Sequence, residues 1–375
     1  MARALATFSL KDQLFNAESL GDLANEFAAG VPGFDRAAFH AAALSGIADR
    51  TLMECLDWFA DCAEPYLASD FPTMADQLEA AMPAPLDPTL RDDDFGRFIH
   101  AVPGVLVVRH GLEDHSDRAL DLLYAATKRF SMEFYIRPFL NRWPDETLAR
   151  LALWAQDENY HVRRLVSEGT RPKLPWARKV EVGGAQTLPL LDALHGDQTR
   201  FVTRSVANHL NDVAKDDPAA VLDRLSGWEK AGTQSPKELD WMRRHALRTL
   251  IKDGHPGAME MLGYAGDVAV DVALEVATPV IALGDPLDFE VTITASEPAP
   301  VLVDYRIRFA RPGGKTGEKV FKLKVGKVAP GKPLVLRKVH KLKANATTFA
   351  LYPGAHTVIL QVNGVDRAEA AFEIT

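Results

Sequence analysis

The spacing of hydrophobic residues along the chain changes once, close to residue 266. From about residue 35 to 263, apolar residues recur every three or four positions, as in HSDRALDLLYAATKRF. This period predicts amphipathic α-helices. Beyond it, apolar and polar residues alternate in segments rich in Val, Ile, Thr and Phe, such as VLVDYRIRFA, and alternation predicts β-strands. We therefore predict a multidomain protein with an all-α domain at residues 1–266 and an all-β domain at residues 267–375.

The all-β region carries turn signals between its predicted strands. RPGGK at 311–315, APGK at 329–332 and the Asn363–Gly364 pair are sequences that close tight turns and hairpins. About seven or eight short strands within roughly 105 residues are typical of an antiparallel sandwich of the immunoglobulin or fibronectin type. The second domain is thus predicted to be an immunoglobulin-like β-sandwich.

The helical region contains an internal repeat. The similar segments HVRRLV, FVTRSVA and WMRRHAL begin at His161, Phe201 and Trp241, so the offset is 40 residues both times. A period of about 40 residues is typical of a HEAT-like solenoid of stacked helical pairs. In such a solenoid the second helices of successive units line one concave wall.

The 40-residue register places polar residues at equivalent positions of successive units. One repeat position holds an arginine in all three units, and the positions four and eight residues later are also polar. The residues concerned are Arg164, Arg204 and Arg244, then Glu168, Asn208 and Arg248, then Asp212 and Lys252. A spacing of four keeps residues on one helical face. A repeated arginine suits phosphate groups, and the alternative is a wall that is polar because it faces water.

Composition places the chain among ordinary globular proteins. Of its 375 residues 47% are hydrophobic and 25% are charged, and its longest apolar runs are far shorter than a membrane span. The start, MARALATFSLKDQ, lacks the length and cleavage pattern of a signal peptide. The two cysteines, Cys55 and Cys62, are more typical of small packing groups than of a disulfide framework. We expect a cytoplasmic protein that does not bind a membrane.

Charge is distributed unevenly along the chain. The net charge is −8, yet residues 1–100 hold 6 basic and 17 acidic residues, whereas 306–343 hold thirteen basic residues and only one acid, Glu318. In alternating strands many of these basic residues share a face, which is typical of a DNA-backbone surface. The turn that carries Arg311 and Lys315 could then reach a groove. The alternative is solubilising lysine on exposed and edge strands.

Three carboxylates of the helical region are candidates for chemistry: Glu133, Glu168 and Asp212. An acid among aromatic residues, as Glu133 is in RFSMEFYIRPFL, must be paired, solvated or functional. Each acid also has a nearby cation that could neutralise it in a structural ion pair, and these are Arg137, Arg164 and Lys215 respectively. No phosphate loop, dinucleotide motif or metal-ligand spacing occurs, so we expect no metal and no cofactor.

Several of these segments resemble a known family. RFSMEFYIRPFL, HVRRLVSEGTRPKLPW and SVANHLNDVAKDDP, with LKDQLFN near the amino terminus, resemble signature segments of the DNA alkylation repair glycosylases, in the AlkC-type branch. The resemblance covers about residues 8–265, and its most specific part is the Arg-Pro-x-Leu-Pro-Trp run. Some members of this branch carry an added immunoglobulin-like domain after the helical repeats.

The resemblance implies a function in base excision repair. It implies that HEAT-like repeats cradle duplex DNA and excise N-alkylated bases, chiefly 3-methyladenine and, in this branch, 3-methylcytosine, without flipping the base. Glu133, Glu168 and Asp212 match the acidic cluster of the family. Carboxylates in that place would stabilise the oxocarbenium-like sugar and orient the attacking water. The implied partner is double-stranded DNA containing alkylated bases, bound by a monomer that associates with the nucleoid when it is on DNA.

The resemblance also implies the contacts to DNA. Trp176, stiffened by Pro172 and Pro175, would pack against the lesion's sugar and phosphate. The other expected contacts, chiefly to phosphates, come from Arg164, Arg171, Arg204, Asn208, Arg244 and Arg248. We expect Glu168 to lack a partner within the chain, an ion pair with Arg164 being the alternative. Trp176 could instead be a core residue, and the whole chain a non-catalytic HEAT scaffold that binds nucleic acid or a protein.

Overall fold

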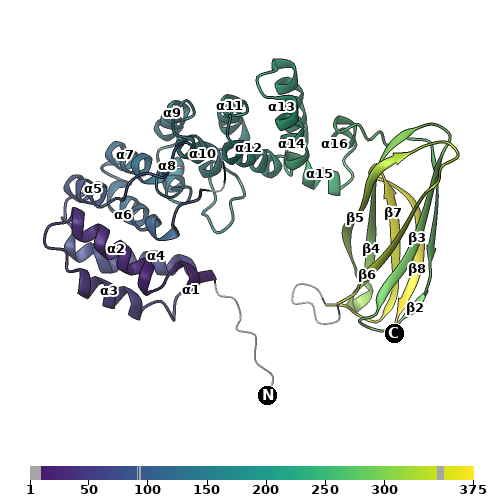
Figure 1. Ribbon diagram of the computed structural model, residues 1–375, viewed down its shortest axis with the longest axis horizontal. Coiled ribbons are helices and arrows are strands. Elements are labelled where there is room, and N and C mark those ends of the chain that lie inside the picture. Colours follow the sequence, from purple (N-terminus) through teal and green to yellow (C-terminus); the bar gives the residue numbers. More distant parts are fainter. Residues whose placement is uncertain (1–9, 91, 93, 344–349) are drawn as a thin grey trace. The chain divides into compact units, whose positions relative to one another are not determined.

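The computed structural model describes residues 10–90, 92, 94–343 and 350–375. Helices form its amino-terminal part and strands its carboxy-terminal part (Figure 1), which confirms the predicted fold class. Within the described residues the α-helices are α1 (Leu10–Leu14), α2 (Ala17–Gly30), α3 (Arg36–Ser45), α4 (Leu52–Ala63), α5 (Phe71–Ala80), α6 (Val102–Gly111), α7 (Ser116–Thr127), α8 (Ile136–Arg142), α9 (Pro144–Trp154), α10 (Tyr160–Gly169), α11 (Gly184–Leu194), α12 (Arg200–Val213), α13 (Pro218–Ala231), α14 (Pro236–Ala246), α15 (Arg248–Lys252) and α16 (Pro256–Met261).

Helices α10, α12 and α14 lie side by side in the order that the 40-residue repeat predicts. Helix α12 contacts α10 on one side and α14 on the other, and α9 and α11 pack behind α10 (Figure 1). Helix α10 begins after Asn159, whose side-chain oxygen accepts a hydrogen bond from the His161 N–H at 2.9 Å. Its apolar face, with Val162 and Leu165, is fully buried. The stacked-pair solenoid is therefore built by burying one stripe of each helix.

The carboxyl end of α10 packs very closely on α8. A Cβ atom added at Gly169 would lie 2.5 Å from Cγ2 of Ile136, which is closer than van der Waals contact allows. Only glycine therefore permits this approach. The close packing places the residue before it, Glu168, in the interior.

The third repeat departs from the register that we predicted. Helix α14 ends at Ala246, Leu247 lies in a turn with φ −89° and ψ 2°, and the short helix α15 begins at Arg248. A spacing of four aligns side chains only within one unbroken helix, so the argument for a common face of Arg244, Arg248 and Lys252 does not hold across this interruption, and that face stays a prediction.

The β-region is a sandwich of two sheets. One sheet has the order β1-β3-β6 and the other the order β2-β8-β7-β4-β5. All the pairs within these sheets are antiparallel except β2 with β8. The strands are β1 (Val270–Val276), β2 (Val280–Ile281), β3 (Pro286–Ala295), β4 (Ala299–Ala310), β5 (Thr316–Val328), β6 (Leu334–Lys341), β7 (Gly354–Val362) and β8 (Val365–Ile374).

The sandwich core follows the predicted alternation. Alternate residues of β3, such as Phe289 and Val291, and of β4, such as Val303 and Tyr305, are buried between the sheets. The Asn363–Gly364 pair forms the predicted two-residue hairpin, with φ values of 52° and 79°. Positive φ at both positions matches the twist of the flanking strands.

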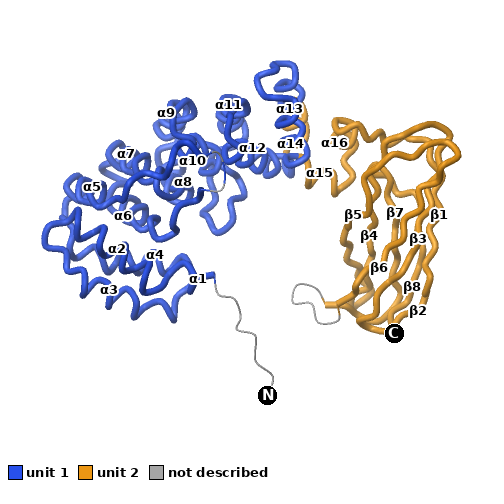
Figure 2. Tube along the Cα trace, in the orientation of Figure 1, with its two compact units in different colours: residues 1–216, 224–246 blue, residues 217–223, 247–375 orange. Residues whose placement is uncertain are grey.

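Contacts divide the chain into two compact units (Figure 2). The first comprises residues 1–216 and 224–246, and the second comprises 217–223 and 247–375. The second unit includes α16, because Met259 and Tyr264 pack with Leu302 of β4. The division describes packing, so the boundary between residues 266 and 267 stays a prediction for the limits of the functional domains. Within the described residues no helix is long and apolar enough to cross a membrane.

Candidate active site

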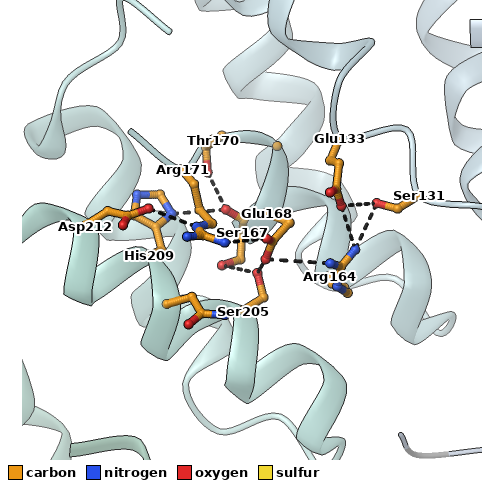
Figure 3. A network of polar contacts seen from close by, with 12 residues as sticks. Ser131, Glu133, Arg164, Ser167, Glu168, Thr170, Arg171, Ser205, His209 and Asp212 are labelled. Atoms are coloured by element: carbon orange, nitrogen blue, oxygen red, sulfur yellow. Dashed lines mark hydrogen bonds and ion pairs between the residues drawn. The ribbon is translucent and has the colours of Figure 1, made fainter. Parts of the chain in front are cut away.

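The three candidate carboxylates come from three different elements of the first unit. Glu133 lies in the turn between α7 and α8, Glu168 in the last turn of α10, and Asp212 in the last turn of α12. Stacking of α10 on α12 brings the two helix ends together, and the turn before α8 lies beside them (Figure 3). The structure thus connects all three in one polar network through two arginines.

Arg171 joins two of the carboxylates. Its Nη1 donates to Oε1 of Glu168 at 2.6 Å and its Nε donates to Oδ2 of Asp212 at 3.0 Å (Figure 3). The arginine is only 8% exposed. We expected Arg171 to hold a phosphate, and this expectation is corrected: its guanidinium is already engaged by two carboxylates in the interior. Charge-assisted hydrogen bonds of this kind also fix the orientation of both acids.

Arg164 joins the third carboxylate to the same network. Its Nη1 donates to Oε2 of Glu133 and to Oγ of Ser131, both at 2.9 Å, while its Nη2 lies 3.8 Å from Oε2 of Glu168. Its guanidinium also lies 4.5 Å from the ring centre of Phe201. The ion pair that we considered between Glu133 and Arg137 is not the one that forms, since Arg164 takes that place.

Glu168 is a buried anion whose partners belong to the chain. Burial by itself raises the pKa of its carboxyl, but the charges of Arg164 and Arg171 outweigh burial and leave the pKa below its ordinary value. A hydrogen bond from Oγ of Ser205 at 2.6 Å adds to this effect. The expectation that Glu168 lacks an internal partner is therefore wrong. The alternative, an ion pair with Arg164, is confirmed at 3.8 Å, and Arg171 is a second and closer partner at 2.6 Å.

Sequence reasoning missed the uncharged members of the network. Ser205 occupies the repeat position of Leu165, which is a buried apolar position in α10. A polar residue at a core position of the repeat was the signal that could have found it. His209 lies one turn further along α12, where Nδ1 is 3.1 Å from the carbonyl oxygen of Ser167. Burial lowers the pKa of His209 to about 4, so its ring is neutral and donates from Nδ1.

Trp176 is displayed on the surface of the loop that follows α10. Its side chain is 70% exposed, so the alternative of a core tryptophan is wrong. Its φ of 62° is a left-handed conformation that costs a non-glycine residue energy. Leu174, which is buried, anchors the loop two residues earlier. Strain of this kind persists only where the surrounding structure enforces it.

The other predicted DNA contacts of the first unit are arranged along the wall. Arg204 forms an ion pair with Asp92, from the loop before α6. Ring nitrogen Nε2 of His245 lies 2.8 Å from the side-chain oxygen of Asn208, and Arg244 pairs with Asp240 one turn earlier at 3.0 Å. The sequence predicted the positions of these residues but not these partners.

The remaining predicted contacts lie in the second unit, with Arg248 in α15 and Arg311 and Lys315 in the turn between β4 and β5. The Arg311 N–H donates to the Lys315 carbonyl oxygen at 2.9 Å and closes that turn. Among the thirteen basic residues counted in this region, Arg306, Arg308 and Arg337 pair with acids. The uncompensated positive charge of residues 306–343 is thus smaller than the number of basic residues in the sequence indicates. Within the described residues no cluster of three His, Cys, Asp or Glu could hold a metal ion.

We predict that glycine relieves the strain at position 176. Trp176→Gly and Trp176→Ala both remove the exposed ring, but alanine keeps the cost of a left-handed φ. The free energy of unfolding should therefore be higher for the glycine variant by about 1 kcal/mol, measured by urea denaturation with far-UV circular dichroism. The same two substitutions at the exposed Lys173 serve as control, where glycine should give the lower value. Equal stability at position 176 would contradict the strain.

We also predict a pH-dependent stability gap between the wild-type protein and Glu168→Gln. The folded-state pKa of Glu168 lies below its ordinary value of 4.5, so the unfolded chain takes up this proton first as the pH falls. The stabilisation from the carboxylate is therefore full above pH 4.5 and lost as the pH falls through the folded-state pKa.

The wild-type melting temperature should exceed that of Glu168→Gln at pH 7, because glutamine removes one of the two carboxylates that Arg164 and Arg171 each face. The gap should narrow as the pH is lowered to about 4. An exposed substitution, Glu181→Gln, controls for the loss of one formal charge. A gap that stays constant across this range would mean that Glu168 is not stabilised as an anion.

Comparison with known proteins places the chain in a family. A family model described as "Uncharacterised protein YhaZ, C-terminal Ig-like domain" matches residues 271–375. The protein YhaZ of Bacillus subtilis (strain 168) is 31% identical over 272 residues, which cover 72% of this chain and 74% of that protein. The solved structure of the Pseudomonas fluorescens alkylpurine DNA glycosylase AlkC, bound to DNA containing an abasic site analog, is 33% identical, with a TM-score of 0.84 over 98% of this chain and 100% of that one. The chain therefore belongs to the DNA alkylation repair glycosylase family, in the AlkC-type branch that carries a C-terminal immunoglobulin-like domain.

Proposed function

We propose that the protein is a monofunctional DNA glycosylase that excises cationic N-alkylated bases from duplex DNA in base excision repair. The substrates proposed are 3-methyladenine and 3-methylcytosine. Family membership supports this class of activity, as AlkC of the same family is an alkylpurine DNA glycosylase. The observation that carries the proposal is the network in which two arginines hold three carboxylates, Glu133, Glu168 and Asp212.

The proposed excision reaction requires negatively charged groups in fixed positions beside the deoxyribose of the lesion. An N3-alkylated adenine is cationic and leaves without being protonated, so the positive charge develops on the deoxyribose. Each of the three carboxylates is held by a cation of the chain. Arg164 and Arg171 bind them from the interior, and Nζ of Lys215 lies 3.4 Å from Oδ1 of Asp212. Carboxylates that such partners orient in advance can stabilise an oxocarbenium-like transition state. The same carboxylates can orient the attacking water, and the product is an abasic site.

Trp176 supplies the proposed contact to the DNA backbone. Its exposed ring, on a loop anchored by Leu174, would pack against the sugar and phosphate of the lesion while the base stays in the helix. Arg204, Asn208 and Arg244 would meet phosphates along the wall. For Arg204 this requires exchange of its Asp92 partner for a phosphate. We propose that a monomer binds DNA in this way, and that the acidic excess of residues 1–100, apart from Asp92, lies away from the contact.

A non-catalytic scaffold is the alternative function. The observation that favours it is that each of the three carboxylates has an internal partner, as in a purely structural ion-pair network. A scaffold would release no base from methylated duplex DNA above the spontaneous rate. Release of 3-methyladenine by the wild-type protein excludes this alternative.

Neutralising one carboxylate should slow excision. We predict that Glu168→Gln and Asp212→Asn each lower the single-turnover rate of 3-methyladenine release by about 100-fold, the usual cost of losing one electrostatic contact to a transition state. The measurement is release of labelled base from methylated duplex DNA, with folding checked by circular dichroism. Asp216→Asn, an exposed partner of Lys173, is the matched control and should keep the full rate. Full activity in both buried variants would remove these residues from the mechanism.

The β4–β5 turn should contribute to DNA affinity. We predict that the double variant Arg311→Ala, Lys315→Ala binds duplex DNA more weakly and loses about two charges from the salt dependence of binding. Fluorescence anisotropy over a range of salt concentrations measures both. Lys230→Ala with Lys237→Ala removes the same charge from exposed positions outside the proposed surface. An equal loss in the two double variants would show a general charge effect and not a contact by this turn.

A further inference from the structure

Arg137 in α8 is a buried cation that contacts the loop bearing Trp176. Its side chain is 0% exposed and is among the largest fully buried side chains of the described residues. Its Nη1 donates to the carbonyl oxygens of Gly169 and Arg171, both at 2.9 Å, and its Nε donates to the carbonyl oxygen of Arg178. A single planar guanidinium therefore holds three backbone acceptors.

These acceptors lie on both sides of Trp176. Gly169 and Arg171 flank the turn at the end of α10, from which the Arg171 side chain reaches back to the two carboxylates. Arg178 lies two residues after Trp176. Arg137 thus forms hydrogen bonds with the backbone both before and after Trp176. The φ of 62° at Trp176 needs such outside support, because it is unfavourable for the residue itself.

A second side chain of α8 continues this attachment. Nδ2 of Asn141 donates to the carbonyl oxygen of Lys179 at 3.0 Å, and its Oδ1 accepts from the N–H of Glu181 at 3.0 Å. We call Arg137 and Asn141 together the α8 clamp. One turn of one helix therefore holds the backbone of the loop from Gly169 to Glu181.

We propose that Arg137 is a positioning residue for base excision: through backbone hydrogen bonds it holds Arg171 between the carboxylates and Trp176 on the surface. This inference rests on the proposed glycosylase function. It explains why α8, which carries none of the predicted catalytic residues, is packed so closely against the end of α10. It also gives a fully buried arginine a role other than pairing with an acid.

The charge and the shape of Arg137 can be tested separately. Burial lowers the pKa of Arg137 to about 10, which still leaves it protonated near neutral pH. Lysine keeps this positive charge beside the carboxylates but cannot reproduce the planar fork that reaches three carbonyl groups. Methionine removes both. If Arg137 acts by positioning, Arg137→Lys and Arg137→Met should have similar defects, whereas a purely electrostatic role would spare the lysine variant.

The experiment measures hydrogen exchange and excision on the full chain. Arg137→Lys should increase amide exchange in the segment 170–182 by about tenfold without a matching increase in α2 and α4. It should lower the single-turnover rate of 3-methyladenine release by about tenfold or more, since small misplacements at a reacting centre are costly. The dissociation constant for undamaged duplex DNA should change little. Arg142→Lys, on the same helix and facing Glu113, is the matched control.

The outcomes separate this inference from the proposed function. Wild-type exchange and a wild-type excision rate in Arg137→Lys would overturn the inference. Faster exchange of the loop with an unchanged rate would overturn it as well, because the loop would then need no positioning. Absence of excision by the wild-type protein itself would instead overturn the proposed function. Should the Arg137 variants fail to fold, Asn141→Ala tests the same clamp from the surface, and wild-type exchange and rate there would overturn the inference.

Discussion

The interior of the first unit depends on one arrangement of charge, in which arginines alternate with carboxylates between the ends of α10 and α12. Arg171 lies between Glu168 and Asp212, and Arg164 lies between Glu168 and Glu133. A buried ion is costly unless opposite charges or hydrogen-bonding groups close to it compensate its charge. Removing one member of the network therefore leaves its neighbours with fewer opposite charges. This constraint keeps Glu168 ionised in a position that water barely reaches.

The charged network and the loop after α10 are held in place by shared contacts. The turn at Gly169 allows α10 to end against α8, and the residues just beyond it supply both Arg171 and Trp176. Arg137 of α8 donates hydrogen bonds to the backbone of this segment. The same few hydrogen bonds therefore hold two features in place. One is the buried Arg171, which neutralises Glu168 and Asp212, and the other is the exposed, strained Trp176. Preorganisation of this kind is what electrostatic stabilisation of a transition state requires.

The sandwich obeys simpler rules. Its alternating strands bury one face, and its turns contain the residues that positive φ demands, as Asn363 and Gly364 do. Its basic character is partly compensated. Arg308 of β4 meets Glu318 on the neighbouring strand β5, and Arg306 of β4 reaches Asp366 on β8, beyond the intervening β7. Counting charges along a sequence overestimates the field of a surface when opposite charges are brought together by strand pairing.

The sequence by itself determined the features that depend on local period and register. Helical and strand spacing separated the two parts of the chain, and the 40-residue repeat placed α10 beside α12, with Arg164, Glu168 and Asp212 near one another. Only the tertiary structure decided the pairing. Arg171 reaches Asp212 across 41 residues and Arg164 reaches Glu133 across 31, while Asp92 meets Arg204 across 112. Such pairs depend on the path of the loops that bring distant residues together, because a side chain bonds to a group that lies within a few ångströms in space. The spacing of residue types identifies residues on the same face of a helix or strand but not the partner of a side chain that lies in a loop.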